Sequence, residues 1–193
     1  MKKISIDIVQ ILQDKMALHV GNKVRAHIDK HISNDSPILV LLNLKDADPI
    51  DYEFINNAFA EIVKKSLKEE NIFIAFIGAG KWETEELYTG LTKIFDLKDG
   101  GDSDKEILIK NDHNFIIINT NNDAIYLTSL NDRNMKVLKE IDEKGSIYSS
   151  QIQEKFKFNA EETTEILNTL LRCKFIYKTE GPVYHSIKCL IFK

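Results

Sequence analysis

Two unbroken apolar segments, residues 38–42 and 72–77, constrain the fold of this chain most strongly. Turn-forming residues flank them, so each segment predicts a β-strand that is buried on both faces. Between them, residues 52–67 carry apolar side chains at the 3.6-residue spacing of an amphipathic helix. This alternation predicts an α/β fold, in which a small mixed sheet has helices on one or both of its faces.

Further signals extend this pattern along the first two thirds of the chain. Alternating isoleucines predict a first strand at residues 4–8, and residues 16–20 form a second candidate strand. Helices are expected after Gly21 and after the glycine turn at 78–80, because apolar residues recur on one face there. Three short strands with Asn- and Asp-rich turns between them are expected at residues 107–109, 115–118 and 125–127.

Three features of residues 3–95 carry a family resemblance. They are the segment Gly21-Asn22-Lys23-Val24-Arg25 that opens a helix, the strand at 38–42, and the helix at 52–67 with Phe54 and Phe59. Together they resemble a STAS-like domain, the class related to anti-sigma-factor antagonists. The resemblance implies a domain that binds a partner protein rather than one that catalyses a reaction.

The chain departs from the STAS-like pattern at two places. Asn43 and Leu44 follow the central strand, where an acidic and an aromatic residue are usual. Phosphoswitch members carry Ser or Thr at the start of the next helix, whereas this chain has Asp51 and Glu53 there. These two carboxylates are candidate partner contacts with a fixed negative charge; alternatively they only stabilise the helix N-terminus.

The C-terminal residues show a clearer order of elements. A helix at 135–143 is followed by a short extended stretch, a short helix that Ser149 and Ser150 can cap, and a turn at Phe158. Asn159 and Glu162 then have the spacing of a capping box for a helix at 160–172. Strands are expected at 175–177 and 183–187 around a tight turn. This order resembles the winged helix-turn-helix superfamily.

That resemblance implies recognition through the helix at 160–172, and two classes of partner stay open. Glu161, Glu162 and Glu165 lie on its expected outer face, where carboxylates repel a DNA duplex. Basic residues flank the face and can contact phosphates from its margins, whereas a protein partner needs no such charge. The residues expected to contact DNA or a protein are Lys155, Lys157, Thr164, Asn168, Arg172, Lys174 and Lys178.

The distribution of charge agrees with two modules. The chain has 193 residues and a net charge of −4, but residues 1–132 hold 15 Lys and Arg against 22 Asp and Glu. Residues 133–193 hold 11 against 8. We expect a STAS-like α/β domain at residues 1–98, short strands at 105–130 that connect or extend a sheet, and a winged helix-turn-helix domain at 131–193.

The chain matches known sequence patterns for enzyme and metal sites poorly. The segment Gly78-Ala79-Gly80-Lys81 lies between a strand and a helix, but it lacks the glycine spacing of phosphate loops and of dinucleotide fingerprints. His27 and His31 have the spacing of two metal ligands, yet no third ligand is evident beyond Asp35. Cys173 and Cys189 form no Cys-x-x-Cys motif, so we expect no catalytic residue, no metal and no cofactor.

The sequence therefore favours a non-enzymatic cytoplasmic regulatory or interaction protein, with no signal peptide and no membrane span. We expect a protein partner, with docking on the first domain changing the exposure or dimer geometry of the second. One alternative is a DNA-binding transcriptional regulator that acts as a homodimer. Another is an enzyme with an unrecognised site, which a pocket converging on Lys81, Trp82 and carboxylates would support.

Overall fold

The chain forms two compact units, which are described separately below. The first comprises Met1–Lys110 with Ile116–Leu127, and the second comprises Asn111–Phe115 with Thr128–Lys193. The computed structural model describes residues 1–12, 20–31, 37–47, 50–69, 71–96, 115–121, 123–128, 130–179 and 181–192.

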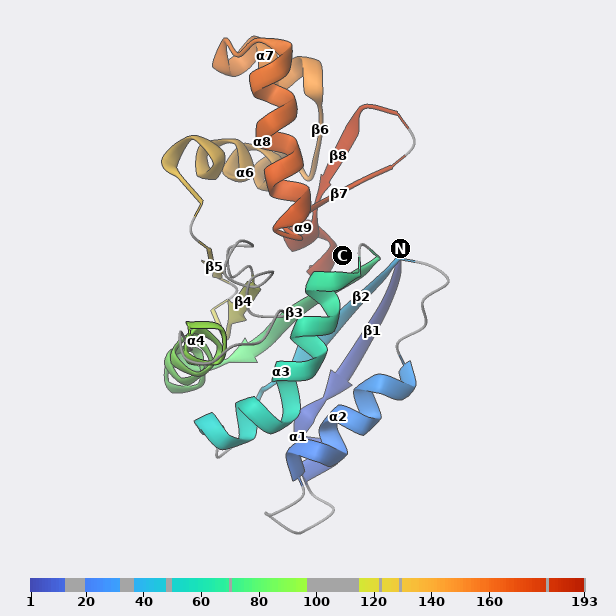
Figure 1. Ribbon diagram of the computed structural model, residues 1–193, viewed down its shortest axis with the longest axis vertical. Helices are drawn as coiled ribbons and strands as arrows, with labels where there is room; N and C mark the ends of the chain where they lie inside the picture. The colour runs from blue at the N-terminus through green and yellow to red at the C-terminus, as the bar shows by residue number, and fades with distance from the viewer. Residues whose placement is uncertain are drawn as a thin grey trace, which may run out of the picture. The chain divides into compact units, whose positions relative to one another are not determined.

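The first unit is built on a five-stranded sheet whose strands follow one another in sequence order (Figure 1). The strands β1 to β4 each run parallel to their neighbours, and a short turn connects β4 to β5, which extends the sheet. The strands are β1 (Lys2–Asp7), β2 (Ile38–Asn43), β3 (Ile72–Ala79), β4 (Phe115–Asn119) and β5 (Ala124–Leu127).

The two apolar segments form the central strands of this sheet, as predicted. All residues from 38 to 42 and from 72 to 76 are buried, which confirms that both faces of β2 and β3 are covered. Phe76 of β3 packs edge-on against Phe59, with ring centroids 5.2 Å apart. The face of the sheet that carries Phe76 therefore faces the helices.

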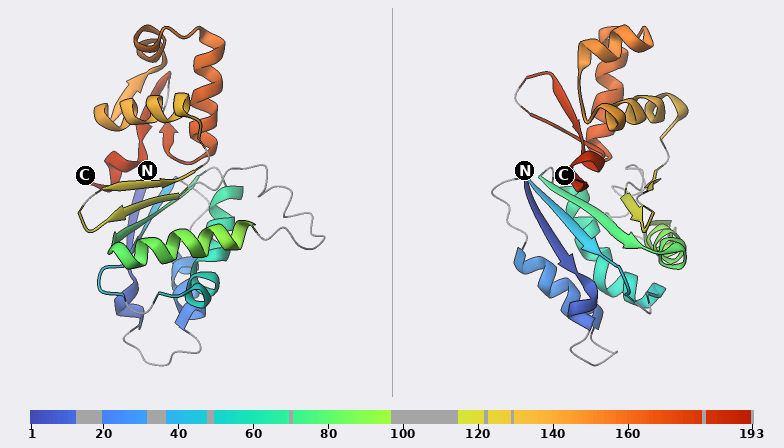
Figure 2. Two further views of the ribbon diagram at one scale, coloured as in Figure 1. Left: turned by 90° about the vertical axis from the view of Figure 1, so that its left-hand side faces the viewer. Right: turned by 180° about the vertical axis from the view of Figure 1, so that it is seen from behind.

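The helices α2, α3 and α4 lie side by side on that face of the sheet (Figures 1 and 2). Parallel strands in sequence order, connected by the usual right-handed crossovers, place all of their connecting helices on one side. The helices of this unit are α1 (Ile8–Leu12), α2 (Val20–His31), α3 (Tyr52–Lys68) and α4 (Lys81–Asp96).

The central helix α3 is packed closely by α4. Gly90 of α4 lies so near α3 that a Cβ atom there would be 2.8 Å from Cδ1 of Ile55. Ile55 is fully buried, which limits how far its side chain can move. A glycine in the middle of a helix lowers its stability, so its presence here reflects the short distance between the two helices.

Some predicted elements of this unit change or lie outside the described residues. The strand expected at residues 16–20 is wrong at Val20, because this residue begins α2, and its other residues are not described. Ile8 begins α1 rather than ending β1, because the Asp7 carboxylate accepts a hydrogen bond from the Val9 N–H. The expected linker at 97–104 and strand at 107–109 also lie outside the described residues.

The second unit contains the helices and strands expected of the C-terminal residues. A three-stranded antiparallel sheet, in the order β6-β8-β7, accompanies three longer helices (Figure 1). Its elements are α6 (Asp132–Lys144), β6 (Ser146–Tyr148), α7 (Ser149–Phe156), α8 (Ala160–Arg172), β7 (Ile176–Lys178), β8 (Val183–Ser186) and α9 (Ile187–Ile191).

The core of this unit is mainly aliphatic, with the aromatic residues Phe175 and Tyr184. Leu138, Ile166 and Leu170 are buried, and Phe175 is among the largest fully buried side chains of the chain. The one unexpected element is α9, since Ile187 was predicted to end the last strand. The Ser186 hydroxyl accepts a hydrogen bond from the Cys189 N–H and so caps this short helix.

Candidate functional site on the second unit

The helix α8 is fixed at its N-terminus by the predicted capping box. The Asn159 side chain accepts a hydrogen bond from the Glu162 N–H at 2.8 Å, and the Glu162 carboxylate accepts one from the Asn159 N–H at 2.9 Å. These two bonds satisfy backbone donors that have no partner within the helix. The start of α8 is therefore set by residues adjacent in sequence.

The outward side of α8 presents a mixed polar surface. Its inner side buries Ile166, Leu167 and Leu170 against the core. The exposed residues on the outward side recur at helical spacing, and we refer to them as the α8 outer face: Glu161, Thr164, Glu165, Asn168 and Arg172. Thr164, Asn168 and Arg172 were predicted contacts, and the structure brings them together here.

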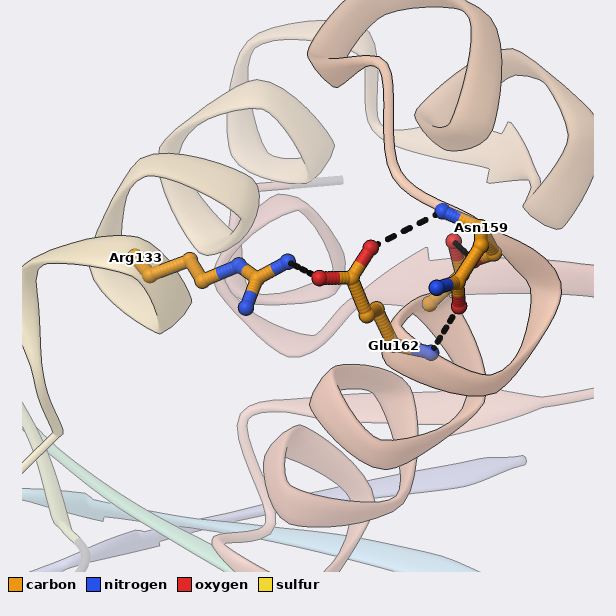
Figure 3. A network of polar contacts seen from close by, with 4 residues as sticks. Arg133, Asn159 and Glu162 are labelled. Atoms are coloured by element: carbon orange, nitrogen blue, oxygen red, sulfur yellow. Dashed lines mark hydrogen bonds and ion pairs between the residues drawn. The ribbon is translucent and has the colours of Figure 1, made fainter.

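Glu162, one of the three carboxylates expected on the outer face, is engaged in two contacts within the unit. One carboxylate oxygen of Glu162 lies 2.8 Å from Nη2 of Arg133, and the other accepts the capping hydrogen bond (Figure 3). The Arg133 guanidinium and the Asn159 N–H therefore lower the pKa of Glu162. The α8 outer face retains two carboxylates, those of Glu161 and Glu165, which form no ion pair within the described residues.

Arg133 also supports the turn between α7 and α8. Its guanidinium lies 4.1 Å from the centroid of the Phe158 ring, and Phe158 stacks on Phe156 with centroids 5.4 Å apart. The first turn of α6 is thus attached to the start of α8 by an ion pair and a cation–π contact. Sequence reasoning missed Arg133, because its partner Glu162 lies on a different helix.

Lys155 was predicted to contact DNA or a protein, but its ammonium group pairs with Glu140 of α6. Glu140 is only 5% exposed, and Lys144 lies 3.0 Å from its second carboxylate oxygen. The hydrogen bond from Lys155 is the main cause of the lowered pKa of Glu140. An unpaired buried carboxylate is costly, so Lys155 contributes to the stability of the unit.

The remaining predicted cations differ in their surroundings. Lys157 is exposed and ends α7 with φ 59°, in the left-handed region. The Lys178 ammonium lies over the Tyr184 ring at 5.6 Å, and Arg172 donates a long hydrogen bond to Thr169. Lys174 is half-buried with φ 58°. Lys157, Arg172 and Lys178 thus keep exposed side chains beside or on α8 and on the hairpin that follows it.

On the first unit, the two predicted contact residues have different roles. The Asp51 carboxylate accepts a hydrogen bond from the Phe54 N–H at 2.8 Å, which makes Asp51 the N-cap of α3. This supports the alternative that Asp51 stabilises the helix. Glu53 is exposed in the first turn, next to Tyr52, whose ring lies 5.8 Å from the Lys93 ammonium. Glu53 remains a candidate contact.

The glycine turn before α4 does not have the geometry of a nucleotide site. Nucleotides bind parallel sheets in the crevice where the strand order reverses, whereas β1 to β5 follow one another without a reversal. Gly78 has φ 70° and simply turns the chain close to Asn43. Lys81 and Trp82 are exposed, and Trp82 is 62% exposed, so both side chains extend into solvent.

The described residues contain no group of three or more His, Cys, Asp or Glu side chains that could hold a metal ion. His27 is exposed on α2, whereas the side chain of His31, and all of Asp35, lie outside the described residues. Among the described residues, neither Cys173 nor Cys189 forms a disulfide bond. In the described part of the chain, no helix is both long and apolar enough to cross a membrane.

Comparison with known protein families, with curated proteins and with solved structures finds no match to this chain.

Proposed function

We propose that this chain is a non-catalytic regulatory protein that pairs a STAS-like domain with a winged helix-turn-helix domain. The order of elements from α6 to β8 and the strand order β6-β8-β7 support the winged-helix assignment. The alternation of β1 to α4, with residues 21–25 in the first long helix, supports the STAS-like one. Docking of a partner on the first domain would then alter what the second domain presents.

The α8 outer face, in this proposal, binds a protein that carries basic side chains. The supporting observation is the distribution of free charge: Glu161 and Glu165 are unpaired within the described residues, while Arg133 and Lys155 are engaged in ion pairs. A DNA reader needs the opposite distribution, because affinity for DNA comes mainly from cations that neutralise phosphates. A basic protein surface, by contrast, is attracted electrostatically by the same two carboxylates.

Site-specific crosslinking tests this proposal. A photoreactive amino acid at Thr164 is activated in cells that produce the chain natively, and adducts are digested with protease or nuclease. We expect a protease-sensitive adduct that the charge reversals Glu161→Lys and Glu165→Lys reduce at least tenfold. The matched control places the photoreactive residue at Lys139 of α6, which is also exposed. A nuclease-sensitive adduct, or none above the control, contradicts protein binding by this face.

A second candidate function, DNA binding as a homodimer, is favoured by the exposed cations Lys157, Arg172 and Lys178. If these side chains contact phosphates, each change to Glu makes the plot of log affinity against log salt concentration less steep, by about one unit of slope. Fluorescence anisotropy with a random-sequence duplex measures that slope. Lys155→Glu is unsuitable for this test, since it would place a second carboxylate beside the buried Glu140. Slopes that these changes leave unaltered contradict DNA binding.

A further inference from the structure

The second unit has a sheet face that its core does not cover. In the register of the sheet, Ile147 and Tyr184 lie opposite each other on the inner face and are buried, as are Ile176 and Ser186. The alternate positions lie on the other side, where every described side chain is half-buried or exposed. We refer to these residues as the outer sheet face: Ser146, Tyr148, Tyr177, Thr179, Val183 and His185.

The outer sheet face carries no Lys, Arg, Asp or Glu side chain among the described residues. Tyr148 is 51% exposed, and Val183 lies opposite it in the register. Tyrosine is enriched at protein interfaces because it offers a large apolar ring together with a polar group. An uncharged patch on a unit with so many surface charges favours contact with another uncharged surface.

Three side chains of this face, those of Tyr177, Thr179 and His185, are held in place by contacts with one another. The Tyr177 and His185 rings stack with centroids 4.8 Å apart and an interplanar angle of 20°. The Thr179 hydroxyl lies 3.0 Å from Nε2 of His185, which holds the imidazole in place. Side chains that are ordered before binding lose little conformational entropy when a partner arrives.

We propose that a second copy of this chain binds here, outer sheet face against outer sheet face. A two-fold contact places a surface against itself, so a surface with a net charge repels its own copy. The α8 outer face carries Glu161 and Glu165 against the single cation Arg172, and so has a net negative charge. The outer sheet face involves no such repulsion and complements itself.

The contact is made by the faces of the strands rather than by their edges. Both edge strands, β6 and β7, are three residues long, too short to add a further strand with useful affinity. The face of such a small sheet is also less than the roughly 800 Å² per partner of a standard interface. The dimer is therefore weak, and it leaves the α8 outer face free.

Analytical ultracentrifugation of the full chain from about 5 to 500 µM tests this contact without any partner present. We expect reversible dimerisation that changes less than twofold between 50 mM and 500 mM salt, because no charge pairs form the interface. Ser146→Lys places like charges on both copies and should weaken dimerisation at least tenfold. Ser146 is exposed, so this variant should fold normally, which circular dichroism verifies.

Lys136→Glu is the matched control, because it changes an exposed charge on α6 and should leave the dimer constant unaltered. The proposal is overturned by a chain that stays monomeric at 500 µM. It is also overturned if Ser146→Lys dimerises as tightly as the unmodified chain, or if Lys136→Glu weakens dimerisation equally. The readout is independent of the proposed function, since self-association needs neither the α8 partner nor DNA.

Discussion

Glu140 is a buried carboxylate whose two ion pairs come from different helices, α6 and α7. Replacing Lys155 with Ala removes the pair to α7 and leaves Glu140 with Lys144. Loss of one partner of a buried pair costs about 3–5 kcal/mol, and the remaining pair and the half-exposed Lys155 reduce this to about 1–3 kcal/mol. Urea denaturation measures the difference.

The matched control for this prediction is Lys157→Ala, two residues further along, where the ammonium is exposed and forms no ion pair within the described residues. Its unfolding free energy should change by less than about 0.5 kcal/mol. Equal destabilisation by the two substitutions would show that Glu140 does not depend on Lys155.

The lowered pKa of Glu140 also makes the stability of the chain depend on pH. Lys155 lowers the pKa of Glu140 in the folded chain below its ordinary value of 4.5. A lowered folded-state pKa stabilises the protein above the unfolded-state pKa, and this contribution is lost as the pH falls through the folded-state pKa. We therefore expect Lys155→Ala to lose less stability than the unmodified chain between pH 4.5 and pH 3. If thermal melts show that both chains lose the same stability over this pH range, the prediction is wrong.

At the scale of elements, the contact between α3 and α4 depends on Gly90. Gly90→Ala should destabilise the first unit by about 1–3 kcal/mol, because the new methyl group overlaps Cδ1 of Ile55, although alanine favours the helix itself. Ile55→Val removes that Cδ1 atom and alone costs about 0.5–1.5 kcal/mol. The double variant should be more stable than the sum of the two changes predicts. Strict additivity in urea denaturation would refute the close contact.

Local signals predicted most elements correctly because they act within a few residues. Asn159 and Glu162 are three positions apart, and their capping box sets the start of α8 as expected. The apolar segments became β2 and β3 because their spacing leaves no face for solvent. Two errors lie at short elements, where one side-chain hydrogen bond decides the outcome. The Asp7 carboxylate starts α1 at Ile8, and the Ser186 hydroxyl turns the end of the expected strand into α9.

At the scale of the whole molecule, the two compact units should open independently. Hydrogen exchange followed by mass spectrometry on the full chain measures this. We expect Lys155→Ala to accelerate exchange in peptides from α6 to α8 and to leave exchange in β2 and α3 unchanged. Gly90→Ala should accelerate exchange in β2 and α3 and leave exchange from α6 to α8 unchanged. If either substitution accelerates exchange in both units, they unfold as one cooperative body.

The sequence alone determined most of the two sets of elements, the cap at Asn159, and the absence of a phosphate-loop pattern in residues 78–81, because periodicity and capping are local. Tertiary structure decided which charges remain free. Lys155 and Arg133 pair with Glu140 and Glu162 on other helices, and only helix packing brings those groups together. The uncharged outer sheet face likewise combines three separate strands, so it exists only once β6, β7 and β8 have paired.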